Sequence, residues 1–218
     1  MMAEYKREFI EFAIAEGVLK FGSFKLKSGR NSPYFFNVGG FNSGEALQKL
    51  GGYYAAALIE SAIHVDCLFG PAYKGIPLVS ATAITLAVEY GIDLPFVFNR
   101  KEPKDHGEGG ALVGAVLSGD VVIVDDVITA GTAIREVITI VEQCPAQVVG
   151  VMVAIDRQER GQGEVLAIQE VERNYGLSVI NVVTLDNIVE HIAAIGDYQR
   201  ELDAIYSYRR EFGIDSIS

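Results

Sequence analysis

Residues 121–133 read VVIVDDVITAGTA: four β-branched residues, two adjacent acids, and a short segment rich in Thr, Ala and Gly. The β-branched run is typical of a short buried strand, and it places Asp125 and Asp126 at the end of that strand. A helix fits the residues that follow, over 131–143. The stretch therefore predicts a strand, a tight turn and a helix in direct succession.

The same alternation continues on both sides of this stretch. Further apolar runs lie at 67–69, 94–98, 148–155 and 179–183, and helices are predicted over 75–90, at about 164–174 and near the C-terminus. Apolar runs too short for helices, alternating with helices, indicate parallel strands that are buried on both faces. We therefore predict the α/β class, with a doubly wound parallel sheet flanked by helices.

The N-terminal part departs from this pattern. Three elements are predicted there: a helix over 3–16, an antiparallel ribbon within 21–38 that turns at 28–30, and a helix from the N-cap Ser43 to about Ser61. Since a domain usually has roughly 100–200 residues, we expect one domain over 1–218. About residues 1–40 would contribute a hood of one helix and the ribbon.

Composition and charge exclude several classes of protein. Half of the 218 residues are hydrophobic and 22% are charged, a globular balance that excludes a disordered chain. The formal net charge of −11 disfavours nucleic-acid binding, which depends on Lys and Arg at phosphates. We find neither a membrane span nor the apolar core of a secretory signal. Cys67 and Cys144 form no CxxC motif, so we expect buried thiols in a reducing cytoplasm.

The residues that follow the strand at 121–124 fit a phosphate site. Backbone N–H groups and hydroxyls of 129–133, with the helix N-terminus behind them, suit a phosphate, and Gly131 lets the backbone approach it closely. Asp125 and Asp126 suit ribose hydroxyls or Mg²⁺ instead. We expect a ligand with a phosphate and vicinal hydroxyls, such as a phosphorylated ribose. The alternative is that one of these acids only caps the turn.

Two further loops carry basic residues. Segment 69–75, FGPAYKG, is a glycine-rich strand end with Lys74, which fits either a diphosphate site or a plain loop with an exposed lysine. Segment 99–110, NRKEPKDHGEGG, mixes cations, acids and glycines. It fits either a lid that closes on a polyanion or a solvated hairpin loop.

The aromatic row 34–36 follows a cluster of cations that includes Lys27 and Arg30. A flat anionic base can stack and pair at such a place. A surface turn with one buried aromatic row is the competing interpretation.

Arg157 follows the apolar run 148–155, so it should lie at the carboxyl end of a strand. Arg is the side chain that holds a carboxylate through two hydrogen bonds, which favours a base that carries a carboxylate. The alternative is a surface ion pair with Asp156 or Glu159. Arg160 competes with Arg157 for the carboxylate.

These segments together resemble the orotate phosphoribosyltransferase family of type I phosphoribosyltransferases. The likeness runs in order along nearly the full chain, at 21–37, 69–75, 98–110, 121–133 and 156–163. It implies the type I phosphoribosyltransferase fold. It also implies transfer of the 5-phosphoribosyl group from phosphoribosyl diphosphate (PRPP) to orotate in de novo pyrimidine (UMP) synthesis. Mg²⁺ would then be bound mainly through PRPP, with no metal ligand expected from the protein.

The resemblance also assigns roles to individual residues. Those expected to bind PRPP are Lys27, Tyr73, Lys74, Arg100, Lys101, Lys104, His106, Asp125, Asp126, Val127, Ile128, Thr129, Ala130, Gly131, Thr132 and Ala133. Those expected to bind orotate are Phe35 and Phe36, through their backbone, with Thr129 and Arg157. The expected catalytic residues are Lys104, His106, Asp125 and Asp126.

The family likeness has a consequence for assembly. In the family, the loop that corresponds to 99–110 covers the diphosphate, often in the active site of the neighbouring subunit, which implies a homodimer with shared active sites. Two rival functions remain. One is a phosphoribosyltransferase that uses a purine base, and the other is a non-catalytic PRPP sensor. A sensor would usually carry a nucleic-acid-binding segment or a basic face, and this acidic chain shows neither.

Overall fold

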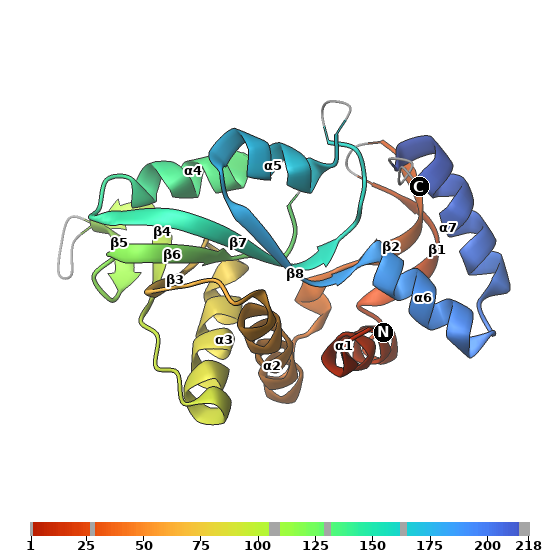
Figure 1. Cartoon of the computed structure of the whole chain (residues 1–218), viewed down its shortest axis with the longest axis horizontal. Coiled ribbons are helices and arrows are strands. Elements are labelled where there is room, and N and C mark those ends of the chain that lie inside the picture. Colours follow the sequence, from red (N-terminus) through yellow and green to blue (C-terminus); the bar gives the residue numbers. More distant parts are fainter. Residues whose placement is uncertain (1, 27–28, 105–109, 129–131, 162–164, 214–218) are drawn as a thin grey trace.

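The computed structural model describes residues 2–26, 29–104, 110–128, 132–161 and 165–213 (Figure 1). The helices in these ranges are α1 (Glu4–Ala15), the short 3-10 helix η1 (Val38–Gly40), α2 (Gly44–Ser61), α3 (Gly75–Tyr90), α4 (Thr132–Val141), α5 (Ala167–Tyr175), α6 (Leu185–Ile195) and α7 (Gln199–Phe212). The strands are β1 (Leu19–Lys25), β2 (Asn31–Phe36), β3 (Cys67–Gly70), β4 (Phe96–Lys104), β5 (Gly110–Gly114), β6 (Gly119–Val124), β7 (Ala146–Asp156) and β8 (Ser178–Thr184).

The strands of the described residues form a two-stranded ribbon and a six-stranded sheet in the order β5-β4-β3-β6-β7-β8. β4, β3, β6, β7 and β8 run parallel, and β5 pairs antiparallel with β4 at one edge. The predicted α/β class and its mostly parallel sheet are therefore confirmed.

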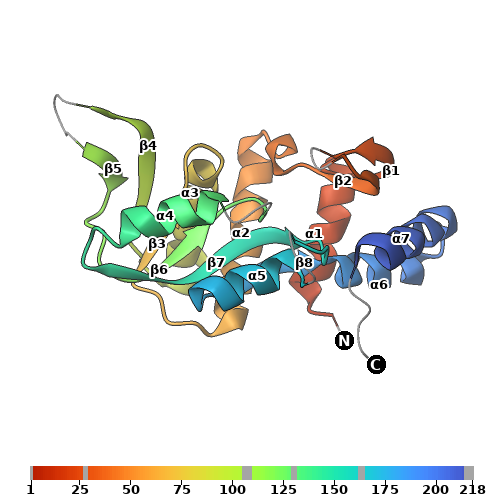
Figure 2. The same cartoon turned by 90° about the horizontal axis from the view of Figure 1, so that it is seen from above.

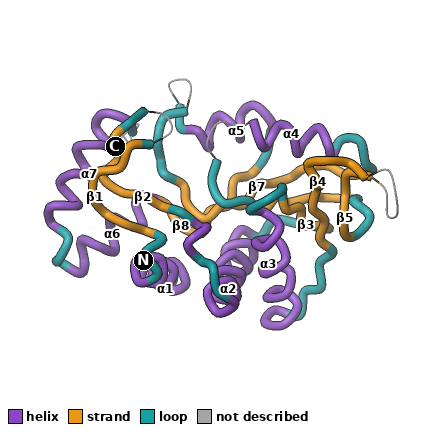
Figure 3. The backbone as a smooth tube through the Cα atoms, turned by 180° about the vertical axis from the view of Figure 1, so that it is seen from behind, coloured by secondary structure: helices purple, strands orange, loops and turns teal. Residues whose placement is uncertain are grey.

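Helices cover both faces of this sheet, as the view from behind shows (Figure 3). α2 and α3 pack against one face, and α4 and α5 lie against the other. Alternate residues of the central strands serve the two sides: Leu68 and Val122 join the core under α2 and α3, whereas Phe69 and Ile123 join the core under α4. Burial on both faces explains why these strands are continuous apolar runs in the sequence.

The hairpin of β4 and β5 differs from the prediction. The strand expected at 94–98 runs on to Lys104, and β5 was not predicted. In this hairpin Asn99 pairs with Leu112 and Lys104 with Gly110, with an irregular register between the two pairs. Strand pairing therefore extends into the charged segment that was expected to be a lid or a hairpin loop. An edge hairpin needs no apolar residues on its solvent side, and hydrophobic pattern alone does not detect it.

The N-terminal elements and the C-terminal helices lie toward the end of the molecule opposite this hairpin (Figure 2). β1 and β2 form the predicted antiparallel ribbon, and β2 packs against α7. α2 begins as predicted, because the Ser43 hydroxyl accepts the N–H of Ala46 at 3.1 Å. None of the helices in the described ranges is long and apolar enough to cross a membrane.

Candidate active site

The carboxyl ends of β3, β6 and β7 lie side by side at one edge of the sheet. β6 pairs in parallel with β3 on one side and with β7 on the other. Segments that leave these ends, at 71–74, 125–128 and 157–160, therefore start from the same edge. Sheets of this kind bind their ligands at that edge.

Asp125 and Asp126 are fixed by the backbone at the end of β6. The Asp125 N–H donates to the carbonyl of Met152 at 3.0 Å, and the Ala154 N–H donates to the carbonyl of Asp126 at 3.0 Å. The hydroxyl of Tyr54, a buried residue of α2, donates to the Asp125 carbonyl at 2.9 Å. These bonds to β7 and α2 fix the position of the backbone from which the two carboxylate side chains extend.

Each of the two carboxylates uses one oxygen as a local acceptor. Asp125 Oδ1 accepts the N–H of Asp126 at 2.8 Å, and Asp126 Oδ1 accepts the N–H of Val127 at 3.0 Å. This is the turn-capping role that competed with ligand binding in the sequence interpretation. Because each carboxylate has a second oxygen, capping and ligand binding are compatible here.

Lys74 pairs with the second oxygen of Asp126. Its Nζ lies 2.5 Å from Asp126 Oδ2. The Asp126 side chain is 12% exposed and that of Lys74 is 58% exposed, so the ion pair lies at the surface of the site. The pair joins the segment after β3 to the segment after β6, which brings together two predicted PRPP-binding residues.

The carboxyl group of Asp125 has a perturbed pKa. Burial is the main cause, and the charge of neighbouring Asp126 adds to it; together they raise the pKa of Asp125 to about 6. Lys74 and the backbone N–H of Asp126 act in the opposite direction. A buried acid with this pKa at a strand end is a feature of functional sites.

Glycines let the segment after β3 approach β6 closely. A Cβ on Gly75 would lie 2.8 Å from the carbonyl oxygen of Val124, and a Cβ on Gly70 would lie 2.4 Å from the carbonyl oxygen of Gly75. Any larger residue at these positions would push Lys74 away from the end of β6. This close approach explains why Gly70 and Gly75 of the FGPAYKG segment have no side chain.

The same segment also contacts β4. The Ala72 N–H donates to Asn99 Oδ1 at 2.8 Å, next to a cis peptide bond between Ala72 and Tyr73. Tyr73 is 68% exposed, and Lys101 Nζ lies 5.1 Å from the centroid of its ring. The structure therefore groups Tyr73 and Lys101 around the same strand-end segment as Lys74, with Arg100 beside Lys101 on β4.

Arg157 lies just past the end of β7, as predicted, and packs on β2. Its guanidinium carbon lies 4.6 Å from the centroid of the Tyr34 ring. Its Nε and Nη2 lie 2.8 Å and 2.7 Å from Glu159 Oε1, and Nη2 donates to the Ser32 hydroxyl at 3.3 Å. The ion pair with Glu159 that was considered from the sequence does form, but Arg157 is largely buried and not a surface residue.

Arg160 and the aromatic pair Phe35 and Phe36 occupy different surroundings. Arg160 Nε donates to the carbonyl of Gly213 at 2.8 Å, so it holds the end of α7. On β2, the Phe36 side chain is buried in the core and Phe35 is 37% exposed. Both follow Tyr34 on β2, and the guanidinium of Arg157 packs on the Tyr34 ring. The predicted base-binding residues therefore lie on β2 and just past the end of β7.

Some predicted residues cannot be compared with the structure. Lys27, His106, Thr129, Ala130 and Gly131 lie outside the described residues. Lys104 ends β4, and Thr132 and Ala133 lie in the first turn of α4, so the helix follows the acidic pair as expected.

Three residues of the site were missed as functional candidates. They are Ser32 and Glu159, which contact Arg157, and Tyr54, which binds the Asp125 backbone. Tyr34 belongs to the aromatic row that was considered for stacking of a base, although its contact with Arg157 was not predicted. Nothing local marks Tyr54, which lies 71 residues before Asp125 in the chain.

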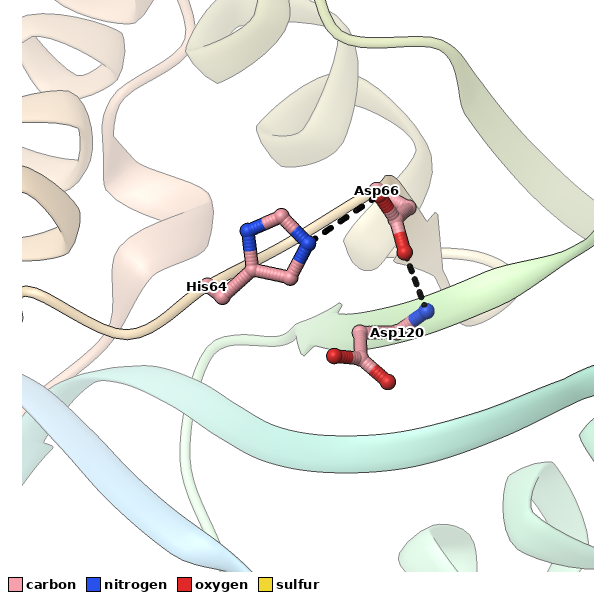
Figure 4. A group of neighbouring side chains, drawn as sticks. All are labelled: His64, Asp66 and Asp120. Atoms are coloured by element: carbon pink, nitrogen blue, oxygen red, sulfur yellow. Dashed lines mark hydrogen bonds and ion pairs between the residues drawn. The ribbon is translucent and has the colours of Figure 1, made fainter.

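His64, Asp66 and Asp120 offer ligand atoms within 4.8 Å of one another (Figure 4). They lie at the amino ends of β3 and β6, whereas the acidic pair lies at the carboxyl end of β6. Asp66 Oδ2 accepts the backbone N–H of Asp120 at 2.8 Å, and the Asp66 N–H donates to the Asp120 carbonyl. These contacts join the starts of β3 and β6. The group therefore has a structural explanation and lies away from the acidic pair.

The fold and the acidic strand end are those of a phosphoribosyltransferase: residues 40–192 match the model of the phosphoribosyl transferase domain. An orotate phosphoribosyltransferase from Pseudomonas aeruginosa strain PAO1 is 58% identical over 213 residues, or 98% of this chain and 100% of the relative. One from Photorhabdus laumondii is 57% identical with the same coverage. The crystal structure of the Francisella tularensis orotate phosphoribosyltransferase is 43% identical, with a TM-score of 0.87 over 94% of this chain and 99% of that one. The chain belongs to the orotate phosphoribosyltransferase family, which confirms the resemblance seen in the sequence.

Proposed function

We propose that the chain transfers the 5-phosphoribosyl group of PRPP to orotate, giving orotidine 5′-monophosphate and diphosphate in pyrimidine synthesis. Family membership over the full chain supports this reaction. Arg157 is the observation that favours orotate among the bases. It presents a guanidinium at the end of β7, and orotate has a carboxylate where uracil, adenine and guanine have none.

The reaction needs no covalent bond to the protein. A ring nitrogen of orotate attacks C1 of the ribose, and the bond from C1 to the diphosphate oxygen breaks, through an oxocarbenium-like state. The work of the protein is therefore to position the substrates and to stabilise charge. We assign the 5′-phosphate to 129–133, with Val127 and Ile128 leading into it, and the ribose hydroxyls to Asp125 and Asp126.

The leaving diphosphate needs positive charge around it. We assign this role to Lys74, Arg100, Lys101, Lys104 and His106. Since Lys74 pairs with Asp126, a diphosphate bound here would share or take over its ammonium group. The same step would release Asp126 Oδ2 for a ribose hydroxyl, so the two binding events should favour each other.

Mg²⁺ is proposed to enter with PRPP. Its chemical contribution is to neutralise the diphosphate, which makes it a better leaving group. The donor chemistry fits, because carboxylate oxygens are the ligands that Mg²⁺ prefers and the acidic pair supplies them at the right edge of the sheet. Asp126 Oδ2 is already paired with Lys74, which agrees with an ion held mainly by the substrate.

We also propose a homodimer with shared active sites. An exposed apolar face on α3 supports it: Ile84 is 63% exposed and Val88 is 78% exposed. A single domain over 1–218 with the hood of residues 1–40, and a place in the cytoplasm, stay predictions. The net charge of −11 supports small-molecule substrates over nucleic acid.

The Arg157→Ala variant tests the choice of base. We expect the KM for orotate to rise at least about tenfold, because one charged hydrogen-bonded pair is lost, while the KM for PRPP stays nearly unchanged. Arg209→Ala is the matched control, since Arg209 pairs with Asp186 at 2.7 Å between α7 and the start of α6. An unchanged orotate KM in folded Arg157→Ala would move the carboxylate site elsewhere, with Arg160 the next candidate.

A further inference from the structure

Glu159 contacts a cluster of buried and partly buried polar residues, and it has no role yet in the proposed reaction. We define the Glu159 cluster as Glu159 with Arg30, Ser32, Tyr34 and Arg157. The Glu159 side chain is 15% exposed. Its Oε1 contacts Arg157 and accepts the Tyr34 hydroxyl at 3.3 Å, and its Oε2 lies 3.5 Å from Arg30 Nη1.

The contacts of Arg157 leave one edge of its guanidinium for a ligand. Glu159 Oε1 occupies the edge formed by Nε and Nη2. Tyr34 covers one face of the plane. Nη2 has two N–H groups, which serve Glu159 and the Ser32 hydroxyl, whereas Nη1 makes no hydrogen bond with any described residue. The edge formed by Nη1 and Nη2 therefore offers the Nη1 donors, and a ligand that also takes Nη2 replaces its 3.3 Å bond to Ser32. A carboxylate can be held by two hydrogen bonds from that edge.

The Glu159 cluster has a net charge of +1. Arg30 and Arg157 contribute two positive charges, and Glu159 contributes one negative charge. One further carboxylate would therefore balance the cluster. Without Glu159, two guanidiniums would lie close together with no counter-charge, and one of them would turn toward water.

α7 closes the cluster from the other side. Tyr208 is buried and its ring meets that of Tyr34 edge-on, at 6.4 Å and 84°. Arg30 lies 5.0 Å from the centroid of the Phe212 ring. The Tyr208 hydroxyl is buried and has no hydrogen-bond partner among the described residues, so it is a donor with unused capacity beside the cluster.

We propose that Glu159 is a positioning residue for the carboxylate of the base. It holds the guanidinium of Arg157 flat on Tyr34 with the Nη1 donors available to the ligand, and it balances the charge of Arg30. This inference rests on the proposed role of Arg157 and goes beyond it: the selectivity for a base with a single carboxylate comes from the pair and not from Arg157 alone.

The test measures kcat and both KM values for Glu159→Ala and Glu159→Gln. Glu159→Ala should raise the KM for orotate by about tenfold or more and change the KM for PRPP much less. Glu159→Gln should have a smaller effect, because its amide oxygen still accepts from Arg157 while its shape preserves the fold. Glu60→Ala is the matched control: Glu60 also binds a tyrosine hydroxyl and a cation, Tyr5 and Lys6, but between α1 and α2.

A double-mutant cycle identifies the route of the effect. In the Arg157→Ala background, Glu159→Ala should cause no further rise in the orotate KM, since it acts through Arg157. Additive effects, or an equal rise in both KM values together with a lower melting temperature, would assign Glu159 a general structural role. A lower orotate KM in Glu159→Ala would mean that Glu159 competes with the substrate. If Arg157→Ala itself leaves the orotate KM unchanged, the proposed function of Arg157 fails, and this inference fails with it.

Discussion

The buried carboxyl group of Asp125 lowers the stability of the fold at neutral pH. It is largely buried, next to a second acid, and its pKa is raised to about 6. Unfolded, an Asp has a pKa of about 4. The folded protein therefore binds the proton more tightly than the unfolded chain, so Asp125 makes the fold less stable as the pH rises from about 4 to about 6, and the full cost persists above that range.

The Asp125→Asn variant should remove this dependence. We expect its free energy of unfolding, relative to the parent, to increase between about pH 4 and 6 and to exceed that of the parent by about 2–3 kcal/mol at neutral pH. The same variant, and Asp126→Asn, should handle PRPP poorly although both stay folded. Urea unfolding across this pH range and PRPP kinetics measure the two effects. Unfolding of either variant with normal PRPP kinetics in the folded fraction would show that the acids only cap the turn.

Single residues also mark the limit of what the sequence predicts. Asp125, Asp126 and Arg157 were predicted at strand ends, because an apolar run fixes where its strand stops. The ion pair of Lys74 with Asp126 was not, since it joins residues 52 positions apart through the packing of β3 on β6. The partner of a side chain depends on tertiary register, which no local pattern contains.

The β4–β5 hairpin is the element that departs most from the sequence interpretation. The sequence predicts a lid or a solvated hairpin loop at 99–110, and the structure forms a hairpin there whose first strand continues as far as Lys104. β5 forms the edge of the sheet, so this hairpin is held by strand pairing on one side only. Elements with few buried contacts open at low free energy, and ligand-binding segments are drawn from such elements.

PRPP should therefore stabilise this hairpin. We expect the amides of 99–104 and 110–114 to exchange hydrogen rapidly in the free protein and more slowly with PRPP and Mg²⁺ bound. The basic side chains of residues 99–110, which we call the lid segment, would gain a counter-charge from the diphosphate. Amides of the central strands β3 and β6 serve as the internal control, because they are already protected. Equal exchange of the hairpin with and without PRPP would remove the lid from the mechanism.

At the level of the whole molecule, the alternation of short apolar runs and helices was enough to predict a mostly parallel sheet. Both faces of that sheet are buried, so the pattern of Val121 to Val124 had one simple interpretation. The hydrophobic pattern did not predict the strand order. It also did not predict that β2 and α7 pack around Arg157. These contacts join the two ends of the chain, and they depend on how the helices pack.

Assembly is the property of the whole molecule that the family resemblance predicts. If the lid segment acts in the site of a partner subunit, chains with Lys104→Ala and chains with Asp125→Asn and Asp126→Asn should each be nearly inactive. Mixing them should restore activity, since each heterodimer then contains one site with both defects and one site with neither. Diphosphate release after subunit exchange measures this. Heterodimers that form and stay inactive would place the lid in the site of its own chain.

The proposed choice of base is tested most directly by measuring diphosphate release by the purified protein with PRPP, Mg²⁺ and one base at a time. The bases are orotate, uracil, adenine and guanine. We expect release with orotate and almost none with the others, because only orotate carries the carboxylate that the guanidinium of Arg157 can bind. Efficient release with a purine base, or binding of PRPP without release for any base, would contradict this proposal.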